Sequence, residues 1–225
     1  MKILLVSATK TEIAQFTDVL GNPTWVNKHL VKYQNQHHQI DVLITGVGMV
    51  FTTFYLSIIL ANNDYDVAIN AGVAGAIDKN IALGRVVNVM DDYFYELGAE
   101  DGNKWLSIGE LGLLNEDDLP YRIDGIFNNM LIQTPQILAL KQVKGQTVNK
   151  VHGNLASIET MKTRSNAQIE SMEGAAFLYC CLQYQLPNVQ VRAISNYVEQ
   201  RNKANWEMPQ AINNLNDFLK KWLNN

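Results

Sequence analysis

Cysteine is scarce in this chain of 225 residues, which has only two, Cys180 and Cys181. They are neighbours within an apolar run, AAFLYCCLQY, and adjacent cysteines cannot easily adopt the geometry of a disulfide. A chain of this length can bury enough apolar surface to fold without disulfides or a structural metal. The sequence therefore predicts one domain over residues 1–225 that works in a reducing compartment, the cytoplasm.

Long apolar runs and an excess of basic residues are also lacking. No segment approaches the roughly 20 apolar residues of a transmembrane helix, and the opening MKILLVSA leads into polar residues without a cleavage site. Lys and Arg number 18 against 22 Asp and Glu, a formal net charge of -4. The chain thus lacks the positive charge that attracts phosphate backbones. We expect neither a membrane nor a nucleic acid as its partner.

Signals for metals and cofactors are missing too. The four histidines, His29, His37, His38 and His152, show no metal-ligand spacing with acids or cysteines. The glycine patterns of dinucleotide sites and P-loops do not occur. We expect no metal and no organic cofactor.

What the chain does contain is an alternation of strand-like and helix-like segments. The expected strands are residues 2–7, 40–45, 67–71, 85–90, 148–155 and 189–195, and the expected helices are 11–20, 50–62, 173–185 and 209–223. This alternation predicts an α/β fold, a three-layer αβα sandwich with helices on both faces of a sheet. Residues 91–124 are looser and more acidic, and we expect excursions from the core there.

Segments that directly follow expected strands are informative, because ligands of open α/β sheets bind at the carboxyl ends of strands. The first strand leads into SATKTE, where Thr9 and Glu12 match the capping box S/T-x-x-E. Taken alone, this match favours Glu12 as a helix cap. Two glycine turns, TGVGM at 45–49 and NAGVAGA at 70–76, can expose backbone amides to a ligand or can simply be tight turns.

Two later segments can likewise be interpreted either as part of a site or as local structure. SMEGAA at 171–176 places Glu173 at the start of a helix of small residues, where an acid also complements the helix dipole. VRAISN at 191–196 ends a strand with Ser195 and Asn196, which could form a turn. Individually, none of these segments distinguishes a site from local structure.

Together and in this order, the segments resemble the nucleoside phosphorylase and nucleosidase superfamily over essentially the whole chain. The last segment and its continuation, YVEQRNKANW at 197–206, resemble most the futalosine hydrolase family, which acts in menaquinone biosynthesis. The resemblance implies a central mixed sheet and hydrolysis of the N-ribosidic bond of a purine nucleoside, most specifically the release of hypoxanthine from futalosine. It also implies a homodimer or larger homo-oligomer, because relatives place their sites near subunit interfaces.

The resemblance also implies roles for individual residues. Glu12 would orient and deprotonate the attacking water, worth about 10²- to 10⁴-fold in rate, and Glu173 would hold the ribose hydroxyls. Asn196 stands where adenine-releasing relatives usually have Asp, and an amide, which both donates and accepts, suits a 6-oxopurine such as hypoxanthine. Further substrate contacts are implied for Met172, Ala74, Gly75 and Ser195.

Futalosine carries a carboxylated aromatic group beyond the ribose, which calls for apolar and cationic contacts. Arg201 and Trp206 are the expected contacts, with Lys203, Tyr93 and Phe94 as further candidates. An amphipathic surface loop explains the same residues equally well.

Three alternatives to this function stay open. A nucleosidase for methylthioadenosine or S-adenosylhomocysteine would use the same fold. Purine nucleoside phosphorylases bind phosphate with arginines of the N-terminal loops, but the first arginine here is Arg85, which favours a hydrolase. In a non-catalytic module that binds a nucleoside, Glu12 would be only a cap.

Overall fold

The structure is a computed structural model that describes residues 1–25, 27–34, 37–115, 120–122 and 125–223. Its strands are β1 (Lys2–Ser7), β2 (Thr24–Trp25), β3 (Leu30–Gln34), β4 (Gln39–Ile44), β5 (Val67–Ala76), β6 (Val86–Asp92), β7 (Gly98–Asp101), β8 (Lys104–Ser107), β9 (Ile126–Phe127), β10 (Lys141–Thr147), β11 (Ile169–Ser171) and β12 (Asn188–Tyr197). Its helices are α1 (Lys10–Thr17), α2 (Met49–Asn62), α3 (Pro135–Leu138), α4 (Leu155–Arg164), α5 (Gly174–Gln183) and α6 (Met208–Leu223), with a 3-10 turn, η1 (Lys203–Asn205).

The main sheet is mixed, as the resemblance implies. Its strand order is β11-β10-β6-β12-β5-β1-β4-β3-β2, and β9 pairs with β6. The central strands β4, β1, β5 and β12 are parallel, whereas β12 runs antiparallel to β6. Strand β11 also pairs with β5 at Gly75 and Ala76, so that β5, β12, β6, β10 and β11 form a closed ring of strands.

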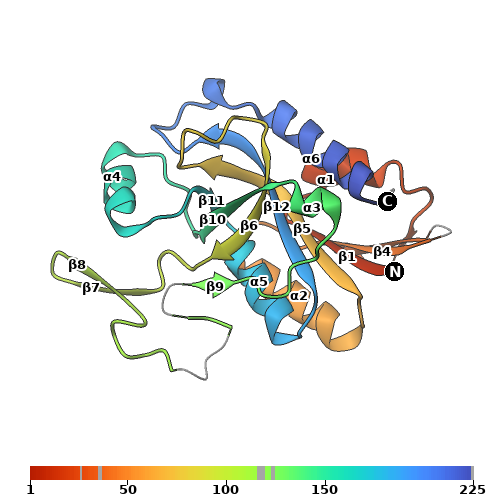
Figure 1. Ribbon diagram of the computed structural model, residues 1–225, viewed down its shortest axis with the longest axis horizontal. Helices are drawn as coiled ribbons and strands as arrows, with labels where there is room; N and C mark the ends of the chain where they lie inside the picture. Colours follow the sequence, from red (N-terminus) through yellow and green to blue (C-terminus); the bar gives the residue numbers. More distant parts are fainter. Residues whose placement is uncertain (26, 35–36, 116–119, 123–124, 224–225) are drawn as a thin grey trace.

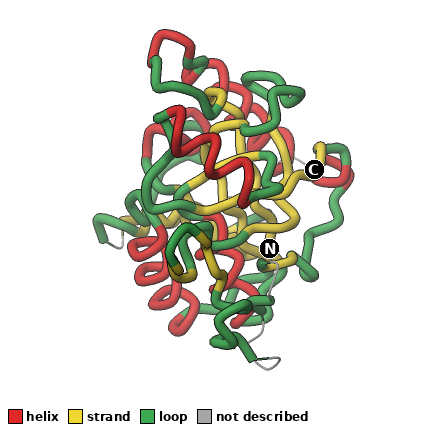
Figure 2. Tube along the Cα trace, turned by 90° about the vertical axis from the view of Figure 1, so that its left-hand side faces the viewer, coloured by secondary structure: helices red, strands yellow, loops and turns green. Residues whose placement is uncertain are grey.

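Helices cover both faces of this sheet, which confirms the three-layer sandwich. Helices α1 and α6 lie on one face and α2 and α5 on the other (Figure 1). The first pair packs through side chains such as Ile13, Phe16 and Leu215, and the second pair through Leu56 and Phe177. The strands run through the middle of the molecule in the perpendicular view (Figure 2). Because both faces are buried, the central strands are nearly continuous apolar runs.

The expected helices are confirmed to within a few residues, but the strand expected at 148–155 is wrong. Strand β10 ends at Thr147, and α4 begins at Leu155. The Asn154 side chain caps α4 by accepting from the amides of Ala156 and Ser157. Strand β10 is hard to find in the sequence because its buried residues include the polar Gln146 and Thr147, which are satisfied by hydrogen bonds.

Residues 91–124, as far as they are described, do leave the main sheet. Strands β7 and β8 form a separate two-stranded sheet at the side of the molecule that also carries α4 (Figure 1). Residues 116–119 and 123–124 of that segment lie outside the described residues. Among the helices that the structure describes, none is long and apolar enough to cross a bilayer.

Candidate active site

Glu12 has two hydrogen-bonded carboxylate oxygens, and they serve different elements. Oε2 accepts from the amide and the hydroxyl of Thr9, at 3.0 and 2.8 Å, so Glu12 does cap α1. Oε1 accepts from the amide of Val73 on β5, at 3.0 Å. The cap therefore fixes the side chain while one oxygen reaches the carboxyl end of the central strands.

Glu173 is the residue before α5, and it is largely buried, at 8% exposure. Its Oε1 accepts from the amide of Gly48, at 3.0 Å. Gly48 has φ of 103°, a backbone conformation that favours glycine. The sequence left open whether the turn at 45–49 exposes amides to a ligand or is simply a tight turn, and in this structure its Gly48 amide orients Glu173.

Arg192 lies between the two acids and was not predicted as a site residue. Its guanidinium is buried on β12, with Nη2 4.0 Å from Oε2 of Glu173. A Cβ added to Gly72 would lie 2.9 Å from Oε1 of Glu12 and 3.2 Å from Nη1 of Arg192, so both groups border the bare glycine. The sequence signal for Arg192 was a charged residue inside the apolar run VRAI. Buried charged side chains are almost always paired, so such a residue implies partners within the core.

Charge and burial oppose each other in this cluster. Burial raises the pKa of Glu173, and Glu12 adds to the rise, whereas Arg192 and the Gly48 amide lower it. Burial also lowers the pKa of Arg192, and the surrounding carboxylates of Glu173, Glu12 and Asp92 raise it. One buried cation thus compensates three acids, and Arg192 holds the cluster together.

A second buried layer supports Arg192 from the side of β6. Asp92, only 1% exposed, accepts from the side-chain amide Nε2 of Gln190 at 2.9 Å and from the hydroxyl of Thr147 at 2.8 Å. The side-chain oxygen Oε1 of Gln190 lies 3.4 Å from Nη2 of Arg192, which also donates to Asn70. The network orients the guanidinium before any ligand binds.

The network predicts a pH dependence of stability. Burial raises the pKa of Asp92 from 3.8 to about 7, against the hydrogen bond from Thr147 and the charge of Arg192. The folded chain therefore keeps a proton that the unfolded chain loses, and the free energy of unfolding falls as the pH rises from about 4 to about 7. We expect urea unfolding to show this fall, and Asp92→Asn, which has no proton to lose, to show a smaller one. Equal pH profiles for both proteins would contradict this assignment.

Asn196 is positioned by an irregularity in β12. Ile194 pairs with Ala74 and Asn196 with Gly75, so Ser195 is the extra residue of a β-bulge, a feature that redirects side chains next to active sites. The Ser195 hydroxyl lies 2.8 Å from Oδ1 of Asn196 and 3.3 Å from the carbonyl of Ala74. Nδ2 of Asn196 donates to the carbonyl of Tyr197 at 2.9 Å. Each polar atom of the amide keeps hydrogen-bonding capacity for a ligand.

Asn196 lines a small cavity of about 60 Å³. Its lining also includes Gly75, His152, Glu170, Arg201 and Trp206. The Arg201 guanidinium lies 5.0 Å from the centre of the Trp206 ring, so these two residues stack on each other. The structure thus places the two expected tail contacts in the cavity of Asn196, with which the sequence analysis did not connect them.

The cavity and the acid cluster meet at the end of β5. Glu12 bonds to Val73, whereas Asn196 pairs with Gly75, about 7 Å further along the strand at the usual rise per residue. None of the described residues that line the cavity is Glu12 or Glu173. Met172 precedes Glu173 and packs on the apolar cluster around Tyr95 and Val198. The structure therefore gathers the predicted site residues into two neighbouring groups, the acid cluster of Glu12 and Glu173 and the polar cavity of Asn196.

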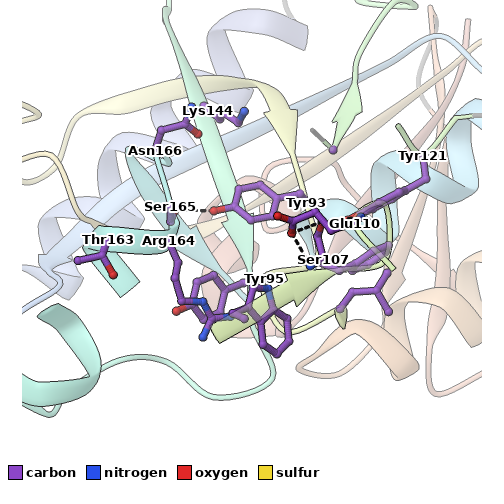
Figure 3. A pocket seen from close by; sticks show the side chains of 14 residues that line it. Tyr93, Tyr95, Ser107, Glu110, Tyr121, Lys144, Thr163, Arg164, Ser165 and Asn166 are labelled. Atoms are coloured by element: carbon purple, nitrogen blue, oxygen red, sulfur yellow. Dashed lines mark hydrogen bonds between the residues drawn. The ribbon is translucent and has the colours of Figure 1, made fainter. Parts of the chain in front are cut away.

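A larger cavity, of about 490 Å³, lies beside α4 and the β7–β8 hairpin (Figure 3). Its walls include Tyr93 and Phe94, two of the further tail candidates. Arg164 stacks on the rings of Tyr95 and Trp105, at 4.6 and 4.1 Å. Aromatic walls and a cation suit a flat ligand with a negative charge.

Comparison with known proteins gives a consistent picture of the relatives. No protein-family model matches the chain. Futalosine hydrolase of Thermus thermophilus is 29% identical over 186 residues, 80% of each chain. A 5'-methylthioadenosine/S-adenosylhomocysteine nucleosidase of Staphylococcus saprophyticus is 26% identical over 209 residues, 87% of this chain and 86% of the relative.

Solved structures share the fold at lower identity. Native futalosine hydrolase of Helicobacter pylori superposes with a TM-score of 0.78 and 16% identity, over 100% of this chain and 98% of that one. The elements that carry the acid cluster and the cavity are thus elements of a fold that nucleosidases use.

Proposed function

The chain is similar in sequence to futalosine hydrolases and shares the fold of nucleosidases, and we propose that it belongs to the nucleoside phosphorylase and nucleosidase superfamily, hydrolyses the N-ribosidic bond of futalosine and releases hypoxanthine. One observation carries the proposal. Oε1 of Glu12 and the guanidinium of Arg192 border Gly72, and Glu173 lies beside them in the same buried cluster. An acid next to a fixed cation can hold a water and take its proton, while a second acid faces the sugar.

The reaction assigns one step to each group. Water attacks C1′ of the ribose, and Glu12 takes up the proton that the water loses. The bond between C1′ and the base nitrogen breaks, and its electron pair leaves with the base. Glu173 binds the ribose hydroxyls and stabilises the positive charge that develops on the sugar. Arg192 positions both acids through the contacts described above.

The departing base is negatively charged and needs a hydrogen-bond donor. Asn196 supplies an NH₂ group and a carbonyl at the end of β12, and Ser195 fixes the orientation of the amide. Gly75 leaves the backbone of β5 open to the base, and Ala74 and Met172 supply the adjoining surface of the site. Since Asn196 shares its cavity with Arg201 and Trp206, these two residues contact the base end of the nucleoside in this arrangement.

Replacing Asn196 with Asp tests this assignment. A protonated Asp donates to an aminopurine as the relatives' Asp does, whereas an ionised one repels the carbonyl of an oxopurine. We expect Asn196→Asp to raise the ratio of kcat/KM for adenosine to kcat/KM for inosine. An unchanged ratio would show that another residue reads the base.

Product analysis tests the function itself. The protein is incubated with futalosine, inosine and methylthioadenosine, each with and without phosphate, and the free base is followed by chromatography. We expect hypoxanthine from futalosine without phosphate. Adenine alone would favour the methylthioadenosine nucleosidase, and turnover only with phosphate would favour a phosphorylase. Binding without turnover would favour a non-catalytic module.

The carboxylated aromatic group of futalosine requires a site of its own. The cavity of about 490 Å³ is the better candidate, because its aromatic walls and Arg164 match that group (Figure 3). The loop of Arg201 and Trp206, the expected site for this group, stays the alternative and borders the smaller cavity next to Asn196.

We propose that the protein forms a homodimer or larger assembly, which the exposed face of α2 supports. Its apolar side chains at helical spacing are 45% to 76% exposed: Val50, Phe51, Phe54 and Ile58. Exposed apolar patches of this kind mark protein interfaces. The patch adjoins Gly48, which orients Glu173, so the interface lies next to the acid cluster.

Replacing Phe54 with Glu should disrupt this interface, because it places a charge among apolar side chains that the partner copy covers. We expect light scattering after gel filtration to show a shift towards monomer. Leu138→Glu on α3, an equally exposed position at 54%, is the matched control and should keep the assembly. A stable oligomer in both variants would place the interface elsewhere.

The proposed compartment is the cytoplasm. Both cysteines are buried and free in the structure, which suits a reducing environment.

A further inference from the structure

The cavity of Asn196 contains a polar pair that the reaction above leaves without a role, His152 and Glu170. Glu170 lies on β11 and pairs with Gly75 of β5, and Gly75 pairs on its other side with Asn196 of β12. The pair and Asn196 therefore flank the same glycine. All four residues line the cavity.

Glu170 fixes the orientation and the tautomer of the histidine. Its carboxylate is buried, at 3% exposure. Oε1 accepts from the backbone amide of His152 at 2.9 Å, and Oε2 accepts from Nδ1 of the same residue and from the side-chain amide of Gln146 at 3.1 Å. The contact with Glu170 places a proton on Nδ1, so in the neutral form of the imidazole the lone pair is on Nε2.

Nε2 is available to a ligand. Among the described residues no hydrogen-bond partner meets this atom, and His152 is part of the cavity lining. The ring of Tyr95 packs edge-on against the imidazole, with 5.1 Å between ring centres, and helps to fix its plane. The backbone amide of His152, already bonded to Glu170, is not available for the base. The imidazole is therefore a fixed hydrogen-bond acceptor.

A fixed acceptor discriminates between the two classes of purine. A 6-oxopurine has a hydrogen on N1, whereas N1 of a 6-aminopurine carries a lone pair. The amide of Asn196 both donates and accepts, so by itself it does not exclude either purine. The lone pair on Nε2 accepts a hydrogen bond from N1 of the 6-oxopurine and repels the lone pair on N1 of the 6-aminopurine.

On this basis we infer that His152, oriented by Glu170, accepts the N1 hydrogen of a 6-oxopurine and selects hypoxanthine-bearing over adenine-bearing nucleosides. The inference rests on the proposed function and adds the residue that determines its base specificity. Glu170 acts through His152 and is a positioning residue.

The test compares futalosine with its 6-amino counterpart at pH 8 in the full-length protein. His152→Phe keeps a ring but removes Nε2, so we expect the oxopurine to aminopurine ratio of kcat/KM to fall about tenfold or more. Glu170→Gln no longer fixes the proton of His152 on Nδ1, because the glutamine amide can either accept from Nδ1 or donate to it. We expect this variant to gain activity on the aminopurine, which a merely structural role would not produce. His37→Phe, at an exposed histidine between β3 and β4, is the control and should keep the ratio.

The outcomes separate this inference from the function on which it rests. If the wild-type protein releases no base from any nucleoside, the proposed function is wrong, and the inference falls with it. If the wild-type protein is active and both variants lose activity equally on the two substrates, the inference alone is overturned. Should His152→Phe fail to fold, as judged by circular dichroism, the ratio in Glu170→Gln decides.

Discussion

Glu12→Gln is expected to lower kcat for futalosine hydrolysis by about 10²- to 10⁴-fold, the usual contribution of a general base. Glutamine keeps the size of the side chain and one carbonyl oxygen, but it cannot take a proton from water. Ligand binding should persist, because Glu173 and Asn196 are unchanged. The measurements are single-turnover rates with saturating substrate and binding of hypoxanthine by calorimetry.

The cap and the base make separate contributions at this position. Glu12 accepts from Thr9 through Oε2 and from Val73 through Oε1. The NH₂ group of the introduced glutamine would face one of these two donors in place of an acceptor oxygen. We therefore expect the variant to lose about 1 kcal/mol of stability. Glu159→Gln, at an exposed glutamate on α4, is the matched control and should retain full activity. A Glu12→Gln protein with nearly wild-type kcat would make Glu12 a cap and no more.

Arg192→Met is expected to cause the largest loss of stability, about 3–5 kcal/mol at pH 7, the usual cost of leaving buried charges without a partner. The guanidinium is 1% exposed and compensates Glu173, Glu12 and Asp92. The loss should shrink at acidic pH, where Asp92 and Glu173, whose pKa values burial raises, take up protons and no longer need the cation. Urea unfolding at pH 5 and pH 8 measures both effects.

Two further variants separate charge from packing at Arg192. Arg85→Met, at an exposed arginine, should change the free energy of unfolding by no more than about 0.5 kcal/mol. Adding Glu173→Gln to Arg192→Met removes one of the uncompensated acids, so part of the lost stability should return. If Arg192→Met and Arg85→Met were equally stable, the acid cluster would not depend on the guanidinium.

Several features of the fold were predictable because local pattern and tertiary role agree. Strand β1 and helix α6 show the expected apolar spacing, since each buries one of its faces or both in the core. Strand β10 was missed because its buried residues are polar and find partners in other elements. The strand expected at 148–155 was wrong for a related reason, since its apolar residues belong to a loop and to the start of α4.

The site was predictable to a similar degree. Glu12 and Glu173 lie at helix starts and Asn196 lies at the end of β12, and motif and position marked them. Arg192 and Glu170 lie inside buried strands. The role of a charged residue there can be recognised only when its partner is known. Those partners are distant in the sequence: Asn70 for Arg192, and His152 for Glu170.

The layers of this protein and the residue types that its chemistry requires can be predicted from the chain alone, because hydrophobic periodicity and short motifs act locally. Which of these residues meet depends on the three-dimensional fold. Arg192 sits between Glu12 and Glu173, and the closure of β11 onto β5 places His152 and Glu170 opposite Asn196. Such contacts depend on strand order and register, which pair residues over a hundred positions apart and leave no mark in any single stretch of the chain.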